Sequence, residues 1–269
     1  MAKFSKPDLS IVLPVYNGEQ FIGANLDRLL EFLKSTSLSY EVIVVDDGST
    51  DRTPEIVRTL VKNNLKLFSH EVNRGKYAAL VTGMSRASGR CRVFTDADLP
   101  FELESLTYLY QLVVDRQFHI VVGDRTLPES VYLQKLGLLR KLSSRAFAFS
   151  IRMLVTGGLF DPQCGLKAFR DDVAEALFPL LQETGFSGDV ELLYIALKYN
   201  LEIKRIPVRF TGSSSSTVSL LFHSLPMLLR VLRLPHRWAS GVYRSKLLGE
   251  IARQDYWNVS NAELYKRAV

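Results

Sequence analysis

The feature that most constrains this chain is a short apolar segment, residues 92–95, followed directly by Asp96 and by Asp98. Side chains two positions apart in an extended segment point the same way, so these two carboxylates are placed to bind one cation. Hard carboxylate oxygens suit Mg²⁺ or Mn²⁺, which complete their coordination with water and substrate phosphates. An Asp-x-Asp pair also occurs in ordinary turns, and the surrounding pattern has to decide between these interpretations.

Strand-like and helix-like segments alternate along the first half of the chain. We expect strands at residues 11–16, 40–45, 65–69, 92–95 and 119–122, and helices at 19–34, from 53 onward, at 76–86 and at 103–116. Strands joined by crossover helices predict an α/β fold with a doubly wound, mostly parallel sheet. Ligands of such sheets bind at the carboxyl ends of the strands, where the polar residues fall.

The second half is less regular. We expect a strand at residues 161–169, a helix at 190–198 and a strand at 202–210, followed by a flexible serine-rich link at 213–216. The sequence therefore predicts an α/β domain over residues 1–212 and a tail over residues 213–269.

The tail is basic and apolar. From Thr217 onward it carries eight Lys or Arg residues against three acidic ones, which accounts for nearly all of the net charge of +6. Its apolar runs are shorter than the roughly 20 residues of a spanning helix. We expect amphipathic helices that lie in an anionic membrane interface, or that pack on the domain, a second copy or a partner subunit. Leucines stand where nucleic-acid binding would favour aromatic residues, so we expect no nucleic acid.

The two cysteines, Cys91 and Cys164, lie in apolar surroundings and form no disulfide framework, which is typical of a reducing compartment. The first residues contain no apolar segment of the kind found in signal peptides. We therefore expect a cytoplasmic protein, held peripherally at the cytoplasmic face of a membrane. Cys164 has no histidine neighbour in sequence, and we expect it to pack rather than react.

Four segments, taken in order, resemble the family-two GT-A glycosyltransferases: residues 11–17, 44–51, 73–80 and 95–98. The resemblance implies the GT-A fold, a nucleotide-sugar donor and a Mg²⁺ or Mn²⁺ ion. It also implies these donor-binding residues: Pro14, Tyr16, Asn17, Asp46, Asp47, Lys76, Asp96, Ala97 and Gln163.

Segments at 123–125, 161–169, 189–193 and 206–209 are similar to the dolichyl-phosphate β-glucosyltransferases. The resemblance implies an inverting enzyme that moves glucose from UDP-glucose to a polyprenyl or dolichyl phosphate. A mannose synthase that uses GDP-mannose is the nearest alternative, because donor choice depends on few side chains. Processive synthases carry Gln-x-x-Arg-Trp, and the window at residues 234–238 here lacks the glutamine.

For the donor, we expect Asp98 to be the main metal ligand, with Asp96 supporting it or contacting ribose. Either Asp46 or Asp47 would read the base while the other forms a turn, and the sequence does not choose between them. Lys76 lies at a predicted helix start, which attracts phosphate.

For the acceptor, the resemblance assigns Arg125, Arg140 and Ser144 to a lipid phosphate, with Arg209 as a weaker candidate. An anionic phosphate requires cations that align it and no strong base. A hydroxyl acceptor would instead require a carboxylate base, and Asp189 is the residue that the resemblance offers. The alternative role for Asp189 is to contact sugar hydroxyls or to orient Gln163. The expected catalytic residues are Asp98, Arg125 and Asp189.

Overall fold

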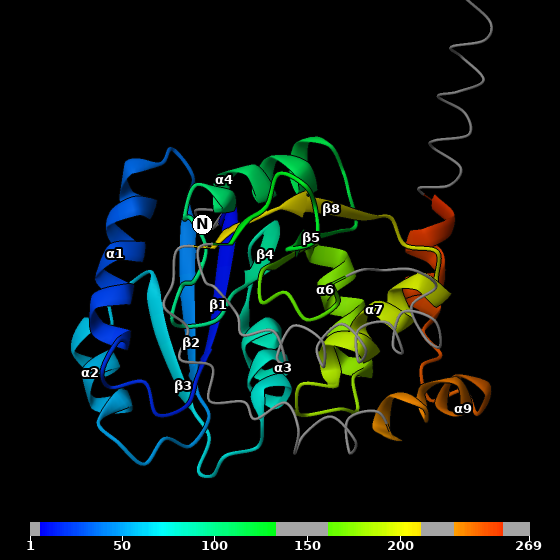
Figure 1. The fold of residues 1–269 in the computed structure, drawn as a ribbon, viewed down its shortest axis with the longest axis horizontal. Coiled ribbons are helices and arrows are strands. Elements are labelled where there is room, and N and C mark those ends of the chain that lie inside the picture. Colours follow the sequence, from blue (N-terminus) through cyan, green and yellow to red (C-terminus); the bar gives the residue numbers. More distant parts are fainter. Residues whose placement is uncertain (1–5, 133–160, 211–228, 255–269) are drawn as a thin grey trace, which may run out of the picture.

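The structure is a computed structural model that describes residues 6–132, 161–210 and 229–254. A seven-stranded sheet forms its centre, in the order β3-β2-β1-β4-β7-β5-β8, and a two-stranded pair, β6-β9, lies beside it (Figure 1). The strands are β1 (Leu9–Val15), β2 (Tyr40–Asp46), β3 (Leu65–Ser69), β4 (Cys91–Phe94), β5 (Ile120–Asp124), β6 (Val131–Tyr132), β7 (Lys167–Arg170), β8 (Ile203–Pro207) and β9 (Arg209–Phe210).

The sheet is parallel except for β7, which runs antiparallel between β4 and β5. Lys167 at the start of β7 pairs with Phe94 on one side and with Val122 on the other. An antiparallel strand begins where its parallel neighbours end. The loop before β7 therefore lies at the same edge of the sheet as the residues that follow β4 and β5.

Helices cover both faces of the sheet and enclose two separate hydrophobic clusters (Figure 1). On one face lie α1 (Ile22–Ser35), α2 (Thr53–Leu60), α4 (Ser105–Tyr110) and the π-helical turn η1 (Gln111–Asp115). On the other lie α3 (Lys76–Arg86), α6 (Asp171–Leu177), the 3-10 turn η2 (Phe178–Leu180) and α7 (Gly188–Lys198). The apolar faces of these helices and the β-branched central strands fill the two layers.

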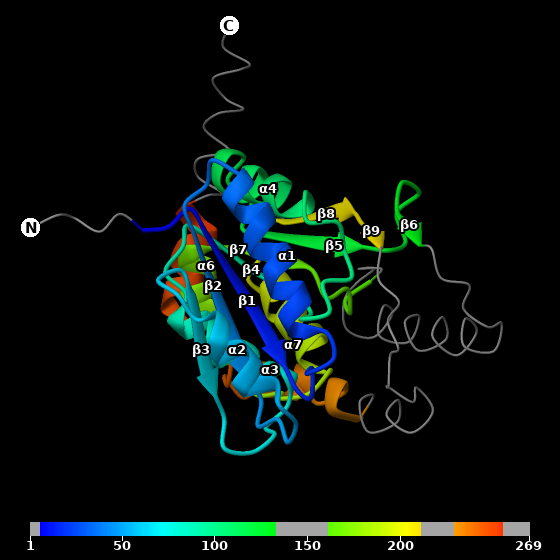
Figure 2. The same ribbon diagram turned by 90° about the vertical axis from the view of Figure 1, so that its left-hand side faces the viewer.

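Most predicted elements of the first half are confirmed, while two predicted strands were too long. Residues 161–166 form turns, and only Lys167–Arg170 are extended. The strand predicted at 202–210 divides at Val208, whose N–H donates to Ser130 Oγ at 3.1 Å. Figure 2 shows the resulting β9 pairing with β6 beyond the end of β5 and β8. The helix α6 was not predicted, and the helix predicted at 103–116 begins later and ends in a π-helical turn.

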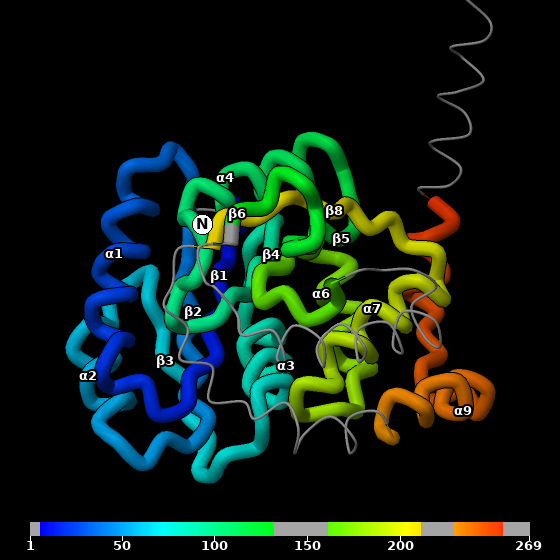
Figure 3. Tube along the Cα trace, viewed as in Figure 1, coloured from blue at the N-terminus to red at the C-terminus, as the bar shows by residue number. Residues whose placement is uncertain are grey.

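Residues 229–254 share the core of the α/β domain. They contain α9 (Leu234–Ala239) and a helix over residues 246–254, and they lie beside α7 (Figure 3). Leu234, Tyr243 and Leu248 are buried in the cluster that also holds α3 and α7. This part of the predicted tail packs on the domain, whereas residues 213–228 and 255–269 lie outside the described residues. None of the helices in the described residues has the length and hydropathy to span a bilayer.

Candidate active site

The turn after β4 brings Asp96 and Asp98 to the carboxyl edge of the sheet. The N–H of Leu99 donates to the carbonyl of Asp96 at 3.0 Å and closes the turn. Leu99 has a φ of 44°, a left-handed conformation that a bulky side chain rarely adopts. Its side chain is buried, so packing holds the strained backbone in place.

Helix α1 fixes the same turn from outside. Asn25 Nδ2 donates to the carbonyl of Ala97 at 3.1 Å, and Arg28 Nη2 donates to the carbonyl of Leu99 at 3.0 Å. These two side chains are one turn apart on α1, and their hydrogen bonds hold the backbone on both sides of Asp98. Sequence patterns gave no signal for them, because neither belongs to a motif.

Asp98 carries an orphaned buried oxygen. Its Oδ1 is buried and has no hydrogen-bond partner among the described residues. Burial, followed by the neighbouring Asp96 carboxylate, raises the pKa of Asp98. A buried carboxylate oxygen without a partner is what a bound cation would satisfy. The described residues offer no set of three His, Cys, Asp or Glu ligands, which suits a cation that takes its remaining ligands from water and substrate.

Lys76 lies at the start of α3 and faces these carboxylates. Its Nζ contacts Asp96 Oδ1 at 2.5 Å, and its side chain is largely buried. Burial alone would lower the pKa of Lys76, but the charges of Asp96, Asp189 and Asp98 outweigh it and raise the pKa. A cation is therefore held at a helix start, where phosphate oxygens bind favourably.

The loop before β7 closes over Asp96. A Cβ placed on Gly165 would lie 2.0 Å from Asp96 Oδ2, so any larger residue at this position would displace the Asp96 carboxylate. Gln163 is half-buried in the same loop, and the Cys164 carbonyl between them accepts a 2.8 Å hydrogen bond from Lys167 Nζ. The antiparallel direction of β7 thus places the backbone of the preceding loop over the carboxylate pair.

The predicted base-reading carboxylates are both buried, Asp46 as the last residue of β2 and Asp47 directly after it. Asp47 accepts from the N–H of Arg74 at 3.0 Å and from the N–H of Gly75 at 2.8 Å, and it contacts His70 Nδ1 at 2.7 Å. Asp46 accepts from the N–H of Ser49 at 3.1 Å. Asp47 therefore ties the end of β2 to the turn that precedes Lys76, a role that the sequence did not indicate.

The turn after β1 lies against the same region. Asn17 has a φ of 52°, and its Oδ1 accepts from the N–H of Thr50 at 2.9 Å. Tyr16 beside it is 48% exposed, and Pro14 is half-buried. The sheet therefore brings the predicted donor residues of β1, β2, α3 and β4 to one edge.

Asp189 is buried and already bonded. Tyr77 donates its hydroxyl to Asp189 Oδ1 at 2.7 Å, and Lys167 Nζ forms an ion pair with the same oxygen. The Lys167 side chain is fully buried and its Nζ lies 5.3 Å from the centre of the Phe94 ring. Sequence reasoning assigned no role to Tyr77 or Lys167, although each falls within a segment that carries the family resemblance.

Arg125, predicted to bind the acceptor, is held by Asp161. The guanidinium donates through Nε and Nη2 to the two Asp161 oxygens, each at 2.7 Å, and the Arg125 N–H donates at 3.0 Å. Burial alone would raise the pKa of Asp161, but the hydrogen bonds and charge of Arg125 lower it. Such a bidentate pair fixes the plane of the guanidinium.

The other predicted acceptor residues are placed differently. Arg209 is 66% exposed and lies 3.9 Å from Glu102, so it is weakly held. Arg140 and Ser144 lie outside the described residues. Cys164 is buried, and burial raises the pKa of its thiol to about 12, so it packs as predicted and is not a nucleophile.

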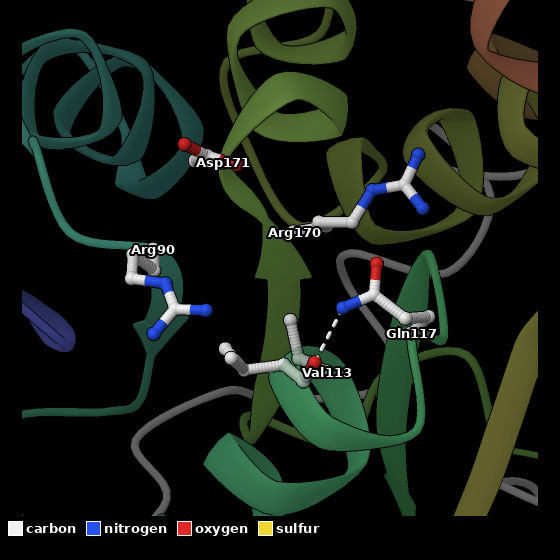
Figure 4. Close-up of a pocket in the computed structure, with 6 residues that line it drawn as sticks. Arg90, Val113, Gln117, Arg170 and Asp171 are labelled. Carbon is white, nitrogen blue, oxygen red and sulfur yellow. Dashed lines mark hydrogen bonds between the residues drawn. The ribbon is translucent and has the colours of Figure 1, made fainter.

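A pocket of about 200 Å³ opens on the opposite edge of the sheet (Figure 4). Arg90 precedes β4, Gln117 precedes β5 and Arg170 ends the antiparallel β7, so these lining residues mark the amino ends of the parallel strands. Arg170 is paired with Asp172 at 2.7 Å. The pocket is remote from the carboxylates and is not part of the candidate active site.

Comparison with known proteins agrees with this geometry. The glycosyl transferase family 2 profile matches residues 10–178. The chain is 30% identical to the dolichyl-phosphate beta-glucosyltransferase of Dictyostelium discoideum and 31% identical to that of Drosophila melanogaster. Each alignment covers 88% of this chain and 77% of the relative.

Among solved structures, the chain is similar to glucosyl-3-phosphoglycerate synthase from Mycobacterium tuberculosis in complex with Mn²⁺, UDP-glucose and phosphoglyceric acid. The TM-score is 0.62 at 20% identity, over 84% of this chain and 79% of the other. This likeness confirms the predicted fold.

Proposed function

This chain belongs to glycosyl transferase family 2, and on that premise we propose that it transfers glucose from UDP-glucose to a polyprenyl or dolichyl phosphate. The single observation that carries the choice of sugar and acceptor is the similarity, over most of both chains, to proteins named dolichyl-phosphate beta-glucosyltransferase. Attack from the face opposite the leaving group inverts the anomeric centre and gives a β-linked product from an α-linked donor.

Asp98 and Asp96 would hold a Mg²⁺ or Mn²⁺ ion, because the buried Asp98 Oδ1 lacks any other partner among the described residues. Such an ion stabilises the negative charge that develops on the nucleoside diphosphate as it leaves. The hydrogen bonds from Asn25 and Arg28 keep the two carboxylates in position without further rearrangement.

Lys76 and the start of α3 supply the positive field for the diphosphate. The Lys76 ammonium lies beside Asp96 and would contact the diphosphate of a bound donor. Asp46, the last residue of β2, or Asp47 beside it would read the base. These contacts would orient the donor for attack by the acceptor.

The state of Asp189 favours a phosphate acceptor over a hydroxyl. A general base needs a free lone pair within reach of the proton that it removes. One oxygen of Asp189 is occupied by Tyr77 and Lys167, and the side chain is almost fully buried. A lipid phosphate is already anionic and needs no base, and Arg125, pre-oriented by Asp161, is suited to align it.

We further propose that the protein works at the cytoplasmic face of a membrane, where a polyprenyl phosphate resides. Leu229 and Leu232 are exposed at the start of the described C-terminal segment, with Arg230 and Arg233 between and beside them. Apolar side chains flanked by arginines favour an anionic lipid surface.

The test of the donor uses radiolabelled UDP-glucose and GDP-mannose in parallel, each with Mn²⁺ and a polyprenyl phosphate in detergent. The proposal predicts label in the organic phase from UDP-glucose. Label from GDP-mannose alone would mean that the enzyme uses the same mechanism with a mannose donor. Label from neither, with UDP still binding, would contradict the proposed acceptor.

A further inference from the structure

Two buried glutamates join the C-terminal segment to the catalytic domain. Glu191 on α7 and Glu183 before it are 0% and 5% exposed. Arg237 Nη1 donates to Glu183 Oε1 at 2.7 Å and to Glu191 Oε1 at 3.2 Å, and the Tyr243 hydroxyl donates to Glu191 Oε1 at 2.6 Å. Arg230 adds a longer contact to Glu183, at 3.4 Å.

The same glutamates hold a loop of the catalytic domain, residues 182–187. The second oxygen of Glu191 accepts from the N–H of Gln182 at 2.9 Å and from the N–H of Glu183 at 2.8 Å. Ser187 Oγ donates to Glu183 Oε2 at 2.7 Å. Glu191 therefore binds the C-terminal segment with one oxygen and the loop with the other, while Glu183, itself in the loop, contacts Arg237 through Oε1 and both Ser187 and Arg230 through Oε2.

The loop in turn lies on the start of α3. The N–H of Tyr77 donates to the carbonyl of Thr184 at 2.7 Å. Gly75 has a φ of 98°, and a Cβ placed there would lie 2.5 Å from the Thr184 oxygen. Gly188, just after the loop, lies directly against the Tyr77 ring. The phosphate-binding turn that carries Lys76 is thus packed on the 182–187 loop.

We propose that Arg237 is a positioning residue, through which the C-terminal segment 230–243 sets the 182–187 loop and so the donor-binding turn at Gly75–Tyr77. The contacts form a path from Arg237 through its hydrogen bonds to Glu183 and Glu191, along the peptide that joins Glu183 to Thr184, and through the Thr184 carbonyl to the N–H of Tyr77. Trp238 anchors the segment separately, with its ring 5.4 Å from that of Tyr199. Loss of Arg237 leaves Glu191 without a cation among the described residues and Glu183 with only the longer contact to Arg230, which strains the loop and leaves the anchor intact.

The first test is amide hydrogen exchange of the metal-free full chain, with no donor or acceptor present. Arg237→Ala is compared with wild type and with Arg233→Ala, a matched control whose side chain is exposed in the same segment. We expect exchange in peptides covering 74–80 and 181–187 to accelerate at least about tenfold in Arg237→Ala, and to stay unchanged in Arg233→Ala.

The second test separates positioning from chemistry in the glucosyl-transfer assay. We expect Arg237→Ala to raise the KM for UDP-glucose about tenfold, with a smaller change in kcat, and Arg237→Lys to recover part of the loss. Should Arg237→Ala not fold, Glu183→Gln removes the same ion pair at nearly equal volume and is expected to give the same pattern.

If amide exchange at 74–80 in Arg237→Ala matches wild type while exchange at 229–243 accelerates, the proposal is overturned. The C-terminal segment would then cover the domain without positioning the loop. The kinetic test rests on the proposed function, whereas the exchange test does not. A wild-type protein that fails to transfer glucose would refute the function, and the exchange result would still decide the role of Arg237.

Discussion

At the scale of single residues, the proposed metal site depends on Asp98. Its buried oxygen lacks a partner among the described residues, and burial together with Asp96 raises its pKa. An ionised carboxylate buried in this way destabilises the metal-free protein and favours the binding of a cation. Such a conflict between stability and function is typical of active sites.

We expect Asp98→Asn to lower glucosyl transfer by about 10³-fold, the loss that several kcal/mol of lost charge stabilisation implies. We also expect the Tm of the metal-free variant to rise, because a raised folded-state pKa means that the ionised carboxylate destabilises the fold at neutral pH. The glucosyl-transfer assay measures the first effect, and scanning calorimetry of the metal-free protein measures the second. A variant with normal turnover would remove Asp98 from the metal site.

The raised pKa of Asp98 also predicts a pH dependence of metal binding. Protons compete with the ion for a carboxylate whose pKa lies above the ordinary value of 3.8. Affinity for Mn²⁺ should therefore fall on acidification below neutral pH, and the fall should begin at a higher pH than for an ordinary aspartate. Titration calorimetry in two buffers with different ionisation enthalpies reports the proton released on binding. A Kd that stays constant over this range would contradict the assignment.

At the scale of elements, the loop before β7 matters most, because the antiparallel strand places it over the carboxylates. We expect Gly165→Ala to push the Asp96 side chain aside, since the added Cβ would meet Oδ2 at 2.0 Å. The fold should survive, because the obstacle is the end of a side chain, while Mn²⁺ affinity should drop about tenfold. Gly185→Ala is the matched control, since a Cβ there meets nothing within 4 Å. Equal metal affinity in the two variants would mean that the loop does not contact the site.

The elements show how far the sequence predicts this fold. The helix at Lys76–Arg86 and the strand at Leu65–Ser69 were predicted to the residue, because helical periodicity and a short apolar run identify such segments. The predicted strand at 161–169 was wrong over its first six residues, since the apolar pattern does not reveal that the chain turns there to cover Asp96.

The candidate site was likewise predicted only in part from the sequence. The carboxylates and Lys76 were predicted because they belong to motifs, and they meet at one edge of the sheet. Lys167 and Tyr77 were missed, since a lysine in a strand and a tyrosine in a helix carry no local signal of burial. The pairing of β7 between β4 and β5 brings Lys167 to Asp189 on α7, and Tyr77 reaches the same carboxylate from α3.

At the scale of the whole molecule, the C-terminal segment is part of the catalytic core. Leu248 is fully buried in the cluster shared with α3 and α7, while its neighbour Leu247 is 48% exposed. We expect Leu248→Ala to reduce the free energy of unfolding by about 3 kcal/mol and Leu247→Ala to change it by less than about 0.5 kcal/mol. Urea unfolding measures both. Equal effects would show that residues 246–254 do not pack on the core.

The predicted acceptor follows from two features of the site. A site with a bonded, buried Asp189 and an arginine oriented by Asp161 suits an anionic nucleophile that needs no base. The most direct measurement supplies UDP-glucose and Mn²⁺ to the full chain with either a polyprenyl phosphate or the matching polyprenol, and follows glucose into the lipid. We predict a β-linked glucosyl phosphate from the first and no product from the second. Transfer to the polyprenol at a comparable rate would contradict the account.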